Sequence, residues 1–287
     1  MERELWPSLY SLLREVGDAF HQRDVSYQPW VIVAVLLWAA LHERDRKWAC
    51  QRRHWSTTRH RPDRLPSQAT VSRRAQDIAV GMLLRALEDR IRAFGAPRLL
   101  AFIDGKPFEV GGPSKDPDAG RGYAAGRMAK GYKIHAIWAD RAVPEAWAVT
   151  PLNVSEKTVA YELMARAGGG GYLLGDGNYD GNRLFDAAAA RGYQLIVPLT
   201  AANAGKGHHY QSPHRLRCID LLRGAFGKEI YAERRRIERA FGNAGSFGGG
   251  WGPLPSWVRR LHRVVTWVWA KLLINGVRIL RKQRLMA

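Results

Sequence analysis

The first 95 residues follow a helical pattern of apolar and polar positions. The run from Trp30 to Leu41 is apolar on every side, which predicts a helix buried at the centre of a helical bundle. It is too short to cross a bilayer, which takes about 20 apolar residues. A basic segment with tryptophans follows over residues 44–64, and Ser67 then stands where the N-cap of another helix is expected. We therefore predict a helical domain over residues 1–95.

Beyond Ala96-Pro97 the pattern changes to that of strands and helices in alternation. Short apolar or alternating runs predict strands over residues 99–103, 132–138, 142–150, 172–174 and 194–199. Helices are expected over residues 155–167, 182–190, about 231–247 and about 256–280, and residues 105–130 and 200–214 have the composition of loops or hairpins. Three strands, a helix, a strand, a helix and a strand imply a mixed sheet flanked by helices. We assign residues 96–287 to this α/β domain.

The composition adds a strong positive charge to this picture. Lys and Arg total 45 against 26 Asp and Glu, a net charge of +19, and much of the excess is arginine. Such a charge favours a polyanionic partner over a small neutral substrate, although a basic surface or association with the ribosome is the simpler alternative. Two cysteines exclude a disulfide scaffold and a four-cysteine zinc site. They fit the cytoplasm, as does the lack of a secretory signal.

Two aspartates follow predicted strands of the α/β domain. Asp104 comes directly after residues 99–103, and Asp176 follows residues 172–174. Active sites of α/β sheets lie at such strand ends. If the two strands are neighbours, the carboxylates repel each other, and a divalent cation such as Mg²⁺ removes the conflict. Glu238, in an arginine-rich helical run, would complete a three-carboxylate metal site. Each aspartate taken alone is more often a turn residue.

Other acidic residues compete for these positions. Asp180 is the rival of Asp176, either as an acid beside the metal site or as a turn residue, and we favour the turn. Glu229 and Glu233 are weaker rivals of Glu238. His208-His209 invites a zinc interpretation, but no cysteine or suitably spaced ligand supports it.

Three short motifs then resemble one known family. Ile103-Asp-Gly-Lys-Pro-Phe108 carries the first aspartate, Leu173-Leu-Gly-Asp-Gly-Asn-Tyr-Asp180 the second, and Arg235-Arg-Ile-Glu-Arg-Ala-Phe241 the glutamate. A Lys-Gly-Tyr-Lys-Ile-His strand over 130–135 and the spacing of Tyr231, Arg234 and Glu238 agree with the same pattern. Together they resemble the DDE transposases of bacterial insertion sequences, whose catalytic domain has an RNase H-like fold. The resemblance extends from the helical region through Glu238.

The resemblance implies a DNA transposase. Asp104, Asp176 and Glu238 would be its catalytic residues and would hold Mg²⁺, with Mn²⁺ as a substitute. The enzyme would cut at the terminal inverted repeats of an element and join the freed 3′-hydroxyl to target DNA, as a homodimer on DNA in the cytoplasm, associated with the nucleoid and not with a membrane. The alternatives are a structure-specific nuclease without strand transfer and an inactive, transposase-derived DNA-binding protein. Gly245 favours these alternatives, because it stands where the family signature has a lysine.

Several basic and aromatic side chains are expected to contact DNA. Residues 66–74 have the look of a recognition helix, although an amphipathic helix with a solvated face fits equally well. The expected contacts are Arg73 and Arg74 in that helix, Lys130 and Lys133 in the predicted strand, and Tyr231, Arg234, Arg235 and Arg239 around the cut. Trp251 is the best candidate for stacking on an unpaired base.

Overall fold

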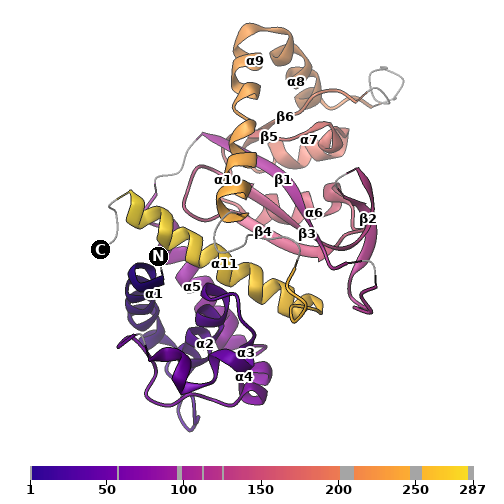
Figure 1. The fold of residues 1–287 in the computed structure, drawn as a ribbon. Helices are drawn as coiled ribbons and strands as arrows, with labels where there is room; N and C mark the ends of the chain where they lie inside the picture. Colours follow the sequence, from indigo (N-terminus) through magenta and orange to yellow (C-terminus); the bar gives the residue numbers. More distant parts are fainter. Residues whose placement is uncertain are drawn as a thin grey trace. The chain divides into compact units, whose positions relative to one another are not determined.

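The computed structural model describes residues 2–56, 58–95, 99–111, 113–124, 126–200, 210–245 and 254–283 (Figure 1). The chain forms two compact units, one of Met1–Gly95 with Ala244–Ala287 and one of Ala96–Asn243. The sequence analysis grouped the last helix with the α/β domain, whereas its packing groups it with the N-terminal helices. No helix among these residues is long and apolar enough to cross a membrane.

The helical unit is organised around one buried helix. α2 (Pro29–Leu41) has every residue from Val31 to Leu41 buried, which confirms the prediction from its apolar pattern. Around it pack α1 (Glu2–Gly17), α5 (Ile78–Arg92) and the C-terminal α11 (Leu261–Lys282) (Figure 1). The short helices are η1 (Asp18–Phe20), α3 (Arg46–Ala49), η2 (Arg52–Trp55) and α4 (Gln68–Arg74). Ser67 caps α4 as predicted, because its Oγ accepts a hydrogen bond from the Thr70 N–H at 3.2 Å.

Tryptophans fill the interior of this unit. Trp38 stacks on Trp55 with ring centroids 4.6 Å apart, and Trp6 meets Trp38 edge-on at 4.8 Å. All three are at most 2% exposed, so these indoles contribute apolar burial to the core rather than DNA contacts. Trp257, expected on the final helix, is 40% exposed and precedes α11.

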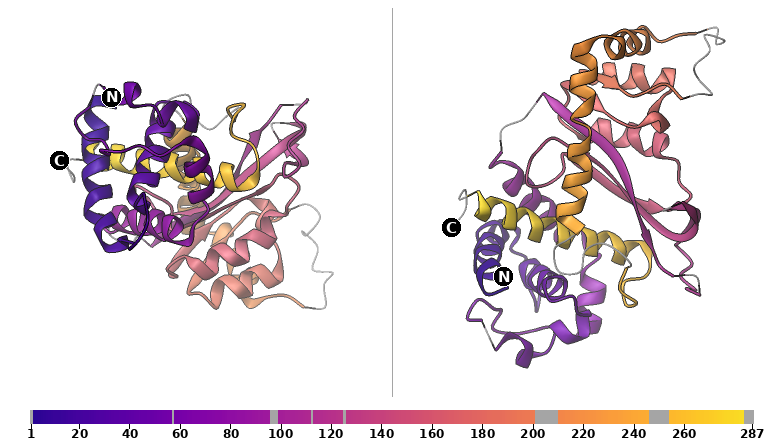
Figure 2. Two further views of the ribbon diagram at one scale, coloured as in Figure 1. Left: turned by 90° about the horizontal axis from the view of Figure 1, so that it is seen from below. Right: turned by 45° about the horizontal axis from the view of Figure 1, so that its top comes forward.

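The other unit is a curled mixed sheet flanked by helices, the architecture expected of an RNase H-like domain (Figure 2). Its strands are β1 (Leu100–Glu109), β2 (Gly120–Ala124), β3 (Arg127–Trp138), β4 (Ala146–Pro151), β5 (Gly171–Leu174) and β6 (Tyr193–Ile196). The order is β2-β3-β1-β5-β6, with β4 also paired to β3. β1 and β4 run antiparallel to β3, whereas β5 runs parallel to β1 and β6 parallel to β5.

Several helices pack on this sheet, and two more follow in the chain before residue 246. α6 (Glu156–Arg166) packs on β3 and β4, and α7 (Asn182–Ala189) and α8 (Pro213–Arg223) pack on β6. The short η3 (Gly177–Tyr179) follows β5. The predicted helix over residues 231–247 is instead two helices, α9 (Ala225–Ala232) and α10 (Arg235–Gly245), and α8 lies in a stretch for which no element was predicted.

Residues 105–130 were predicted to be a loop or hairpin region, and β2 and β3 do form a hairpin there, but the start of this segment is strand rather than loop. β1 continues through Gly105 and Pro107 to Glu109, and residues 105–109 pair with residues 131–135 of β3. A proline is tolerated here because β5 pairs only with residues 100–102 of β1, so Pro107 does not need to donate a hydrogen bond to β5. The remainder of that segment contains β2 and the start of β3.

One ion pair in the helical unit is strongly asymmetric. Lys271 of α11 is 0% exposed, and its Nζ lies 2.5 Å from Oε1 of Glu43, which is 34% exposed. Glu43→Gln removes the carboxylate that compensates the buried ammonium and should cost about 3 kcal/mol of unfolding free energy, whereas Lys271→Met leaves a carboxylate that water still reaches and should cost about 1 kcal/mol. Urea denaturation of both variants measures the two losses of unfolding free energy and shows which is larger. The exposed pair Arg90–Glu15 is the control, with a loss below about 1 kcal/mol on Glu15→Gln; equal losses for the two buried-pair variants would contradict the asymmetry.

Candidate active site

The register of two parallel strands places Asp104 and Asp176 side by side. Ala101 pairs with Leu173 and Phe102 with Leu174. Continued along both strands, this register brings Asp104 level with Asp176. The expectation that Asp104 lies past the end of its strand is wrong, because β1 continues and Asp104 pairs with Ala136 of β3. It is β5 that ends, and Asp176 lies just beyond it as the N-cap of η3.

Burial makes this pair of carboxylates costly to ionise. The pKa of Asp104 is raised to about 6, mainly because the group is buried and further because Asp176 and Glu156 are close by, while a hydrogen bond from the Gly105 N–H and the charge of Arg234 oppose the shift. Burial also raises the pKa of Asp176, against a hydrogen bond from the Asn178 N–H. Two partly desolvated carboxylates that repel each other fit a bound divalent cation.

Arg234 is the cation that now lies beside them. Its Nη2 is 3.3 Å from Oδ2 of Asp104, and its Nη1 is 3.9 Å from Oε1 of Glu238. The side chain of Asp104 is 18% exposed and that of Glu238 is 65% exposed. The structure therefore brings the two aspartates together and connects Glu238 to them only through Arg234. No three His, Cys, Asp or Glu side chains of the described residues form a cluster that could hold a metal ion.

Glu238 is exposed because another face of α10 is buried against the sheet. Ile237 is 0% and Phe241 4% exposed, and the ring of Phe241 meets Trp138 of β3 edge-on at 6.0 Å. Arg236 adds an ion pair to Asp140 at 2.7 Å. With that face held against the sheet, Glu238, Arg235 and Arg239 are exposed.

Glu156 is an acidic residue at this site that the sequence analysis missed. It opens α6, and its Oε1 accepts a hydrogen bond from Nζ of Lys133 at 2.6 Å, with both side chains at most 16% exposed. A Cβ added to Gly105 would lie 3.1 Å from this Oε1, so Glu156 is packed directly beside the strand that carries Asp104. An acid in the first turn of a helix is usual for electrostatic reasons alone. Its sequence position therefore gave no sign of a site.

Two tyrosines also lie near the carboxylates. Tyr231, predicted to contact DNA, is in α9, and burial raises its pKa, with smaller influences from Arg234, Asp176 and Asp104. Tyr179 was not predicted. It is 1% exposed, its hydroxyl has no hydrogen-bond partner among the described residues, and burial together with the nearby acids raises its pKa well above the usual value. The Asn-Tyr-Asp motif around it was the available signal.

The other residues predicted to contact DNA differ in whether their side chains are exposed or are already bound within the protein. Arg73, Arg235 and Arg239 are exposed. Arg74 forms an ion pair with Asp77 and donates to Gln22 at 3.0 Å. The ammonium of Lys130 donates to the Ser114 carbonyl at 2.8 Å, and that of Lys133 is bound to Glu156. Trp251 and His208-His209 lie outside the described residues.

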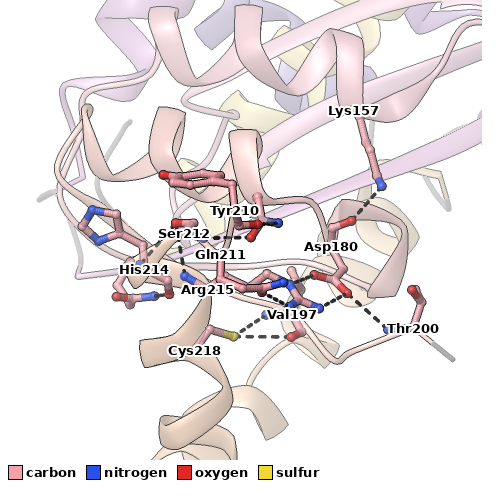
Figure 3. Close-up of polar contacts among 12 residues, drawn as sticks. Lys157, Asp180, Val197, Thr200, Tyr210, Gln211, Ser212, His214, Arg215 and Cys218 are labelled. Carbon is pink, nitrogen blue, oxygen red and sulfur yellow. Dashed lines mark hydrogen bonds and ion pairs between the residues drawn. The ribbon is translucent and has the colours of Figure 1, made fainter. Parts of the chain in front are cut away.

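Asp180 has a structural role. Figure 3 shows its carboxylate facing the guanidinium of Arg215. Oδ1 lies 2.8 Å from Nε, and Oδ2 lies 3.2 Å from Nη2. The exposed fractions of the two side chains are 0% and 4%. The carbonyl of Asp180 accepts from Lys157 at 2.7 Å, and Oδ2 accepts from the Thr200 N–H at 3.4 Å. The turn interpretation is the better of the two, because Asp180 ends η3 and joins it to α8.

The stability of the metal-free protein should depend on pH through Asp104. Its folded pKa of about 6 lies above the ordinary 3.8, so ionisation costs folding free energy that is small near pH 4 and grows as the pH rises through 6. Asp104→Asn should therefore raise the unfolding free energy by about 1–3 kcal/mol at pH 7.5 and by much less at pH 4.5. Denaturation in EDTA at both pH values measures this. Asp18→Asn, at a side chain 73% exposed, is the control; a gain independent of pH would contradict the role of burial.

Removing Asp180 should destabilise the fold. Asp180→Ala removes the carboxylate that compensates the buried guanidinium of Arg215 and should cost about 3–5 kcal/mol. The matched change Asp220→Ala, in a pair whose side chains are 74% and 73% exposed, should cost less than about 1 kcal/mol. Thermal denaturation compares the two, and similar losses would show that the buried pair does not stabilise the unit.

Comparison with known proteins agrees with this geometry. Residues 95–273 match the family of the transposase DDE domain, a stretch that contains Asp104, Asp176 and Glu238. No curated protein matches the chain. The match covers well over half of the sequence, and the mixed sheet flanked by helices is consistent with an RNase H-like DDE domain. The chain thus belongs to the transposase DDE domain family.

Proposed function

We propose that the protein is a DNA transposase that cuts phosphodiester bonds at the ends of a mobile element and joins the freed strand to target DNA. The observation that carries this proposal is the pair Asp104 and Asp176, one on β1 and the other just after the parallel neighbouring strand β5, both buried enough for their pKa values to rise. Membership of the family supports DNA as the substrate and a divalent metal ion as the cofactor.

The carboxylates would hold Mg²⁺, with Mn²⁺ as a substitute. Asp104 and Asp176 supply the oxygen ligands that such ions prefer. Glu238 would join them after its side chain leaves Arg234, a movement that its 65% exposure allows. When bound, the ion activates an attacking oxygen and stabilises the leaving oxygen of a phosphodiester.

The cationic residues of the site would position the substrate. Arg234 neutralises Asp104 in the structure, and its planar fork suits a phosphate equally well. Arg235 and Arg239 are exposed on α10 beside Glu238 and would bind the DNA backbone on either side of the cut. Lys133 would act within the site, since Glu156 holds its ammonium there, rather than along the DNA.

The remainder of the chain would recognise the DNA. Residues 1–95 would bind the terminal inverted repeats with Arg73 of α4 facing the duplex, and the enzyme would act as a homodimer in the cytoplasm, associated with the nucleoid. Phosphate contacts release counterions, so binding should weaken steeply as salt rises.

A second candidate function is a nuclease without strand transfer. The observation that favours it is Gly245, which ends α10 where the family signature has a lysine. Such a lysine would hold the DNA backbone near the cut, so its loss affects the placement of the strand end more than the cutting itself. The other alternative is an inactive DNA-binding protein, which would have lost cutting as well as strand transfer.

Substitution of the carboxylates tests the metal site. Asp104→Ala, Asp176→Ala and Glu238→Ala should each lower Mg²⁺-dependent nicking of DNA that carries the element ends below detection, while binding of the same DNA in EDTA stays within about threefold of wild type, because these side chains contribute no positive charge. Glu233→Ala is the matched control, since this glutamate is held by Arg236 at 2.6 Å and should leave nicking intact.

The same assay separates the candidate functions. Joining of a labelled cut end to a second DNA supports transposition, and cutting without joining supports the nuclease. Normal nicking by Glu238→Ala together with loss in Glu156→Ala would assign the third carboxylate to Glu156 instead.

A further inference from the structure

The helical unit contains a cavity that the proposed catalysis does not use. Its volume is 320 Å³, within the range of about 300–1,000 Å³ typical of small-molecule sites. It lies among α2, α3, α4 and α11 and the residues just before α11. All of its lining residues belong to the helical unit and to the described part of the chain.

Positive charge surrounds this cavity without a matching negative charge. Arg44, Arg46, Lys47 and Arg263 line it, and none of them forms an ion pair with a described residue. The one carboxylate in the lining, Asp45, caps α3 by accepting a hydrogen bond from the Trp48 N–H at 2.7 Å. Arg44 and Lys47 are exposed and are screened by water, whereas an anion in the cavity would be attracted by all four cations.

Two buried hydrogen-bond donors at the cavity have no partner. Nη1 of Arg46 and Nε1 of Trp267 are both inaccessible to solvent, and neither bonds to any described residue. Arg46 also lies close enough to Arg263 for the two charges to interact, and burial followed by that repulsion lowers the pKa of Arg46 to about 10. A buried donor without an acceptor costs about 1–3 kcal/mol.

The floor of the cavity is apolar and made partly of very small side chains. Ala39, Ala40 and Ala270 line it, each at most 4% exposed, beside the indole of Trp267. On the α4 side, Gln68 donates to Ser72 at 3.0 Å, and both residues line the cavity. Apolar walls with an amide and a hydroxyl at one edge suit a flat ring that carries polar groups on its rim.

We propose that this cavity binds one nucleotide, with its phosphate on Arg46 and Arg263 and its base over the alanine floor, edged by Gln68 and Ser72. The nucleotide belongs either to a DNA strand that reaches the helical unit or to a free mononucleotide. An inorganic anion alone would use the arginines and leave the apolar floor empty. The site does not depend on cleavage, so it is tested without divalent metal.

Binding to dAMP by calorimetry, and to labelled single-stranded and duplex oligonucleotides by fluorescence anisotropy, tests the site in EDTA. Arg46→Gln and Arg263→Gln should each weaken binding about tenfold to a hundredfold, as expected for a charge-assisted hydrogen bond. Arg46→Lys keeps the charge but loses the planar guanidinium fork, so its affinity should lie between that of Arg46→Gln and that of wild type. Arg85→Gln, at an exposed arginine of α5 outside the cavity, is the matched control and should bind like wild type.

A cavity-filling variant tests the base contact separately. Ala270→Leu keeps every cation and occupies the floor, so it should weaken dAMP binding and leave inorganic phosphate binding unchanged. The melting temperature of Arg46→Gln should be no lower than that of wild type, because the guanidinium nitrogen that is lost had no partner. If Ala270→Leu or Arg46→Gln fails to fold, the binding measured with Arg263→Gln and Arg46→Lys still tests the proposal.

The outcomes distinguish the two sources of the nucleotide. Weaker binding of dAMP by the arginine variants identifies a free nucleotide site, and weaker binding of oligonucleotides alone identifies a nucleotide within a strand. Binding of both ligands by Arg46→Gln and Arg263→Gln at the level of Arg85→Gln would overturn the proposal. Competition by inorganic phosphate as strong as that by dAMP would overturn the base contact.

Discussion

The repulsion between Asp104 and Asp176 is the constraint around which the α/β unit is organised. The parallel pairing of β1 and β5 makes the two carboxylates level, and the hydrophobic residues before them, Phe102 and Leu174, are at most 1% exposed. A strand pair buried in this way cannot move apart to relieve the repulsion without losing core packing. Above the raised pKa of Asp104, where both groups are ionised, the charge must therefore be offset from outside the sheet, by a side chain or by a bound ion.

Arg234 provides this offset in the structure. Its position is set by the turn between α9 and α10, and α10 in turn is held to the sheet by Phe241 on Trp138 and by Arg236 on Asp140. The same guanidinium also reaches Glu238. At the proposed metal site, Arg234 and a divalent cation would therefore compete for the same carboxylates. Metal binding would release Arg234 toward a phosphate at the moment when the substrate needs it, which couples the metal site to the DNA contact through one residue.

The sequence predicted the composition of the site better than its geometry. Asp104, Asp176 and Glu238 stand in motifs specific enough to be recognised together, and apolar patterns predicted the strands before the two aspartates. The pairing of those two strands was only a condition of the argument, and the structure supplies it. The continuation of β1 through Gly105 and Pro107 was missed because those residues disfavour a strand locally, and only pairing with β3 overrides them. Glu156 was missed because its proximity to Asp104 arises from the packing of α6 on β3 and β4, a long-range contact that no local pattern encodes. Arg215 was missed for the same reason, because only its long-range ion pair with Asp180 explains why this arginine is buried.

The C-terminal helix shows why a family domain and a packing unit need not coincide. The match to the transposase DDE domain extends to residue 273, inside α11, whereas α11 packs on α1, α2 and α5. Its buried Lys271 has its partner in Glu43, far away in sequence, and Glu43 holds a positive φ of 53° to follow α2. The N-terminal helices thus depend on a segment that follows Glu238 in the chain. A fragment that stops before α11 would lose this partner and one wall of the arginine-lined cavity, so the helical unit and the family domain have to be studied in one chain.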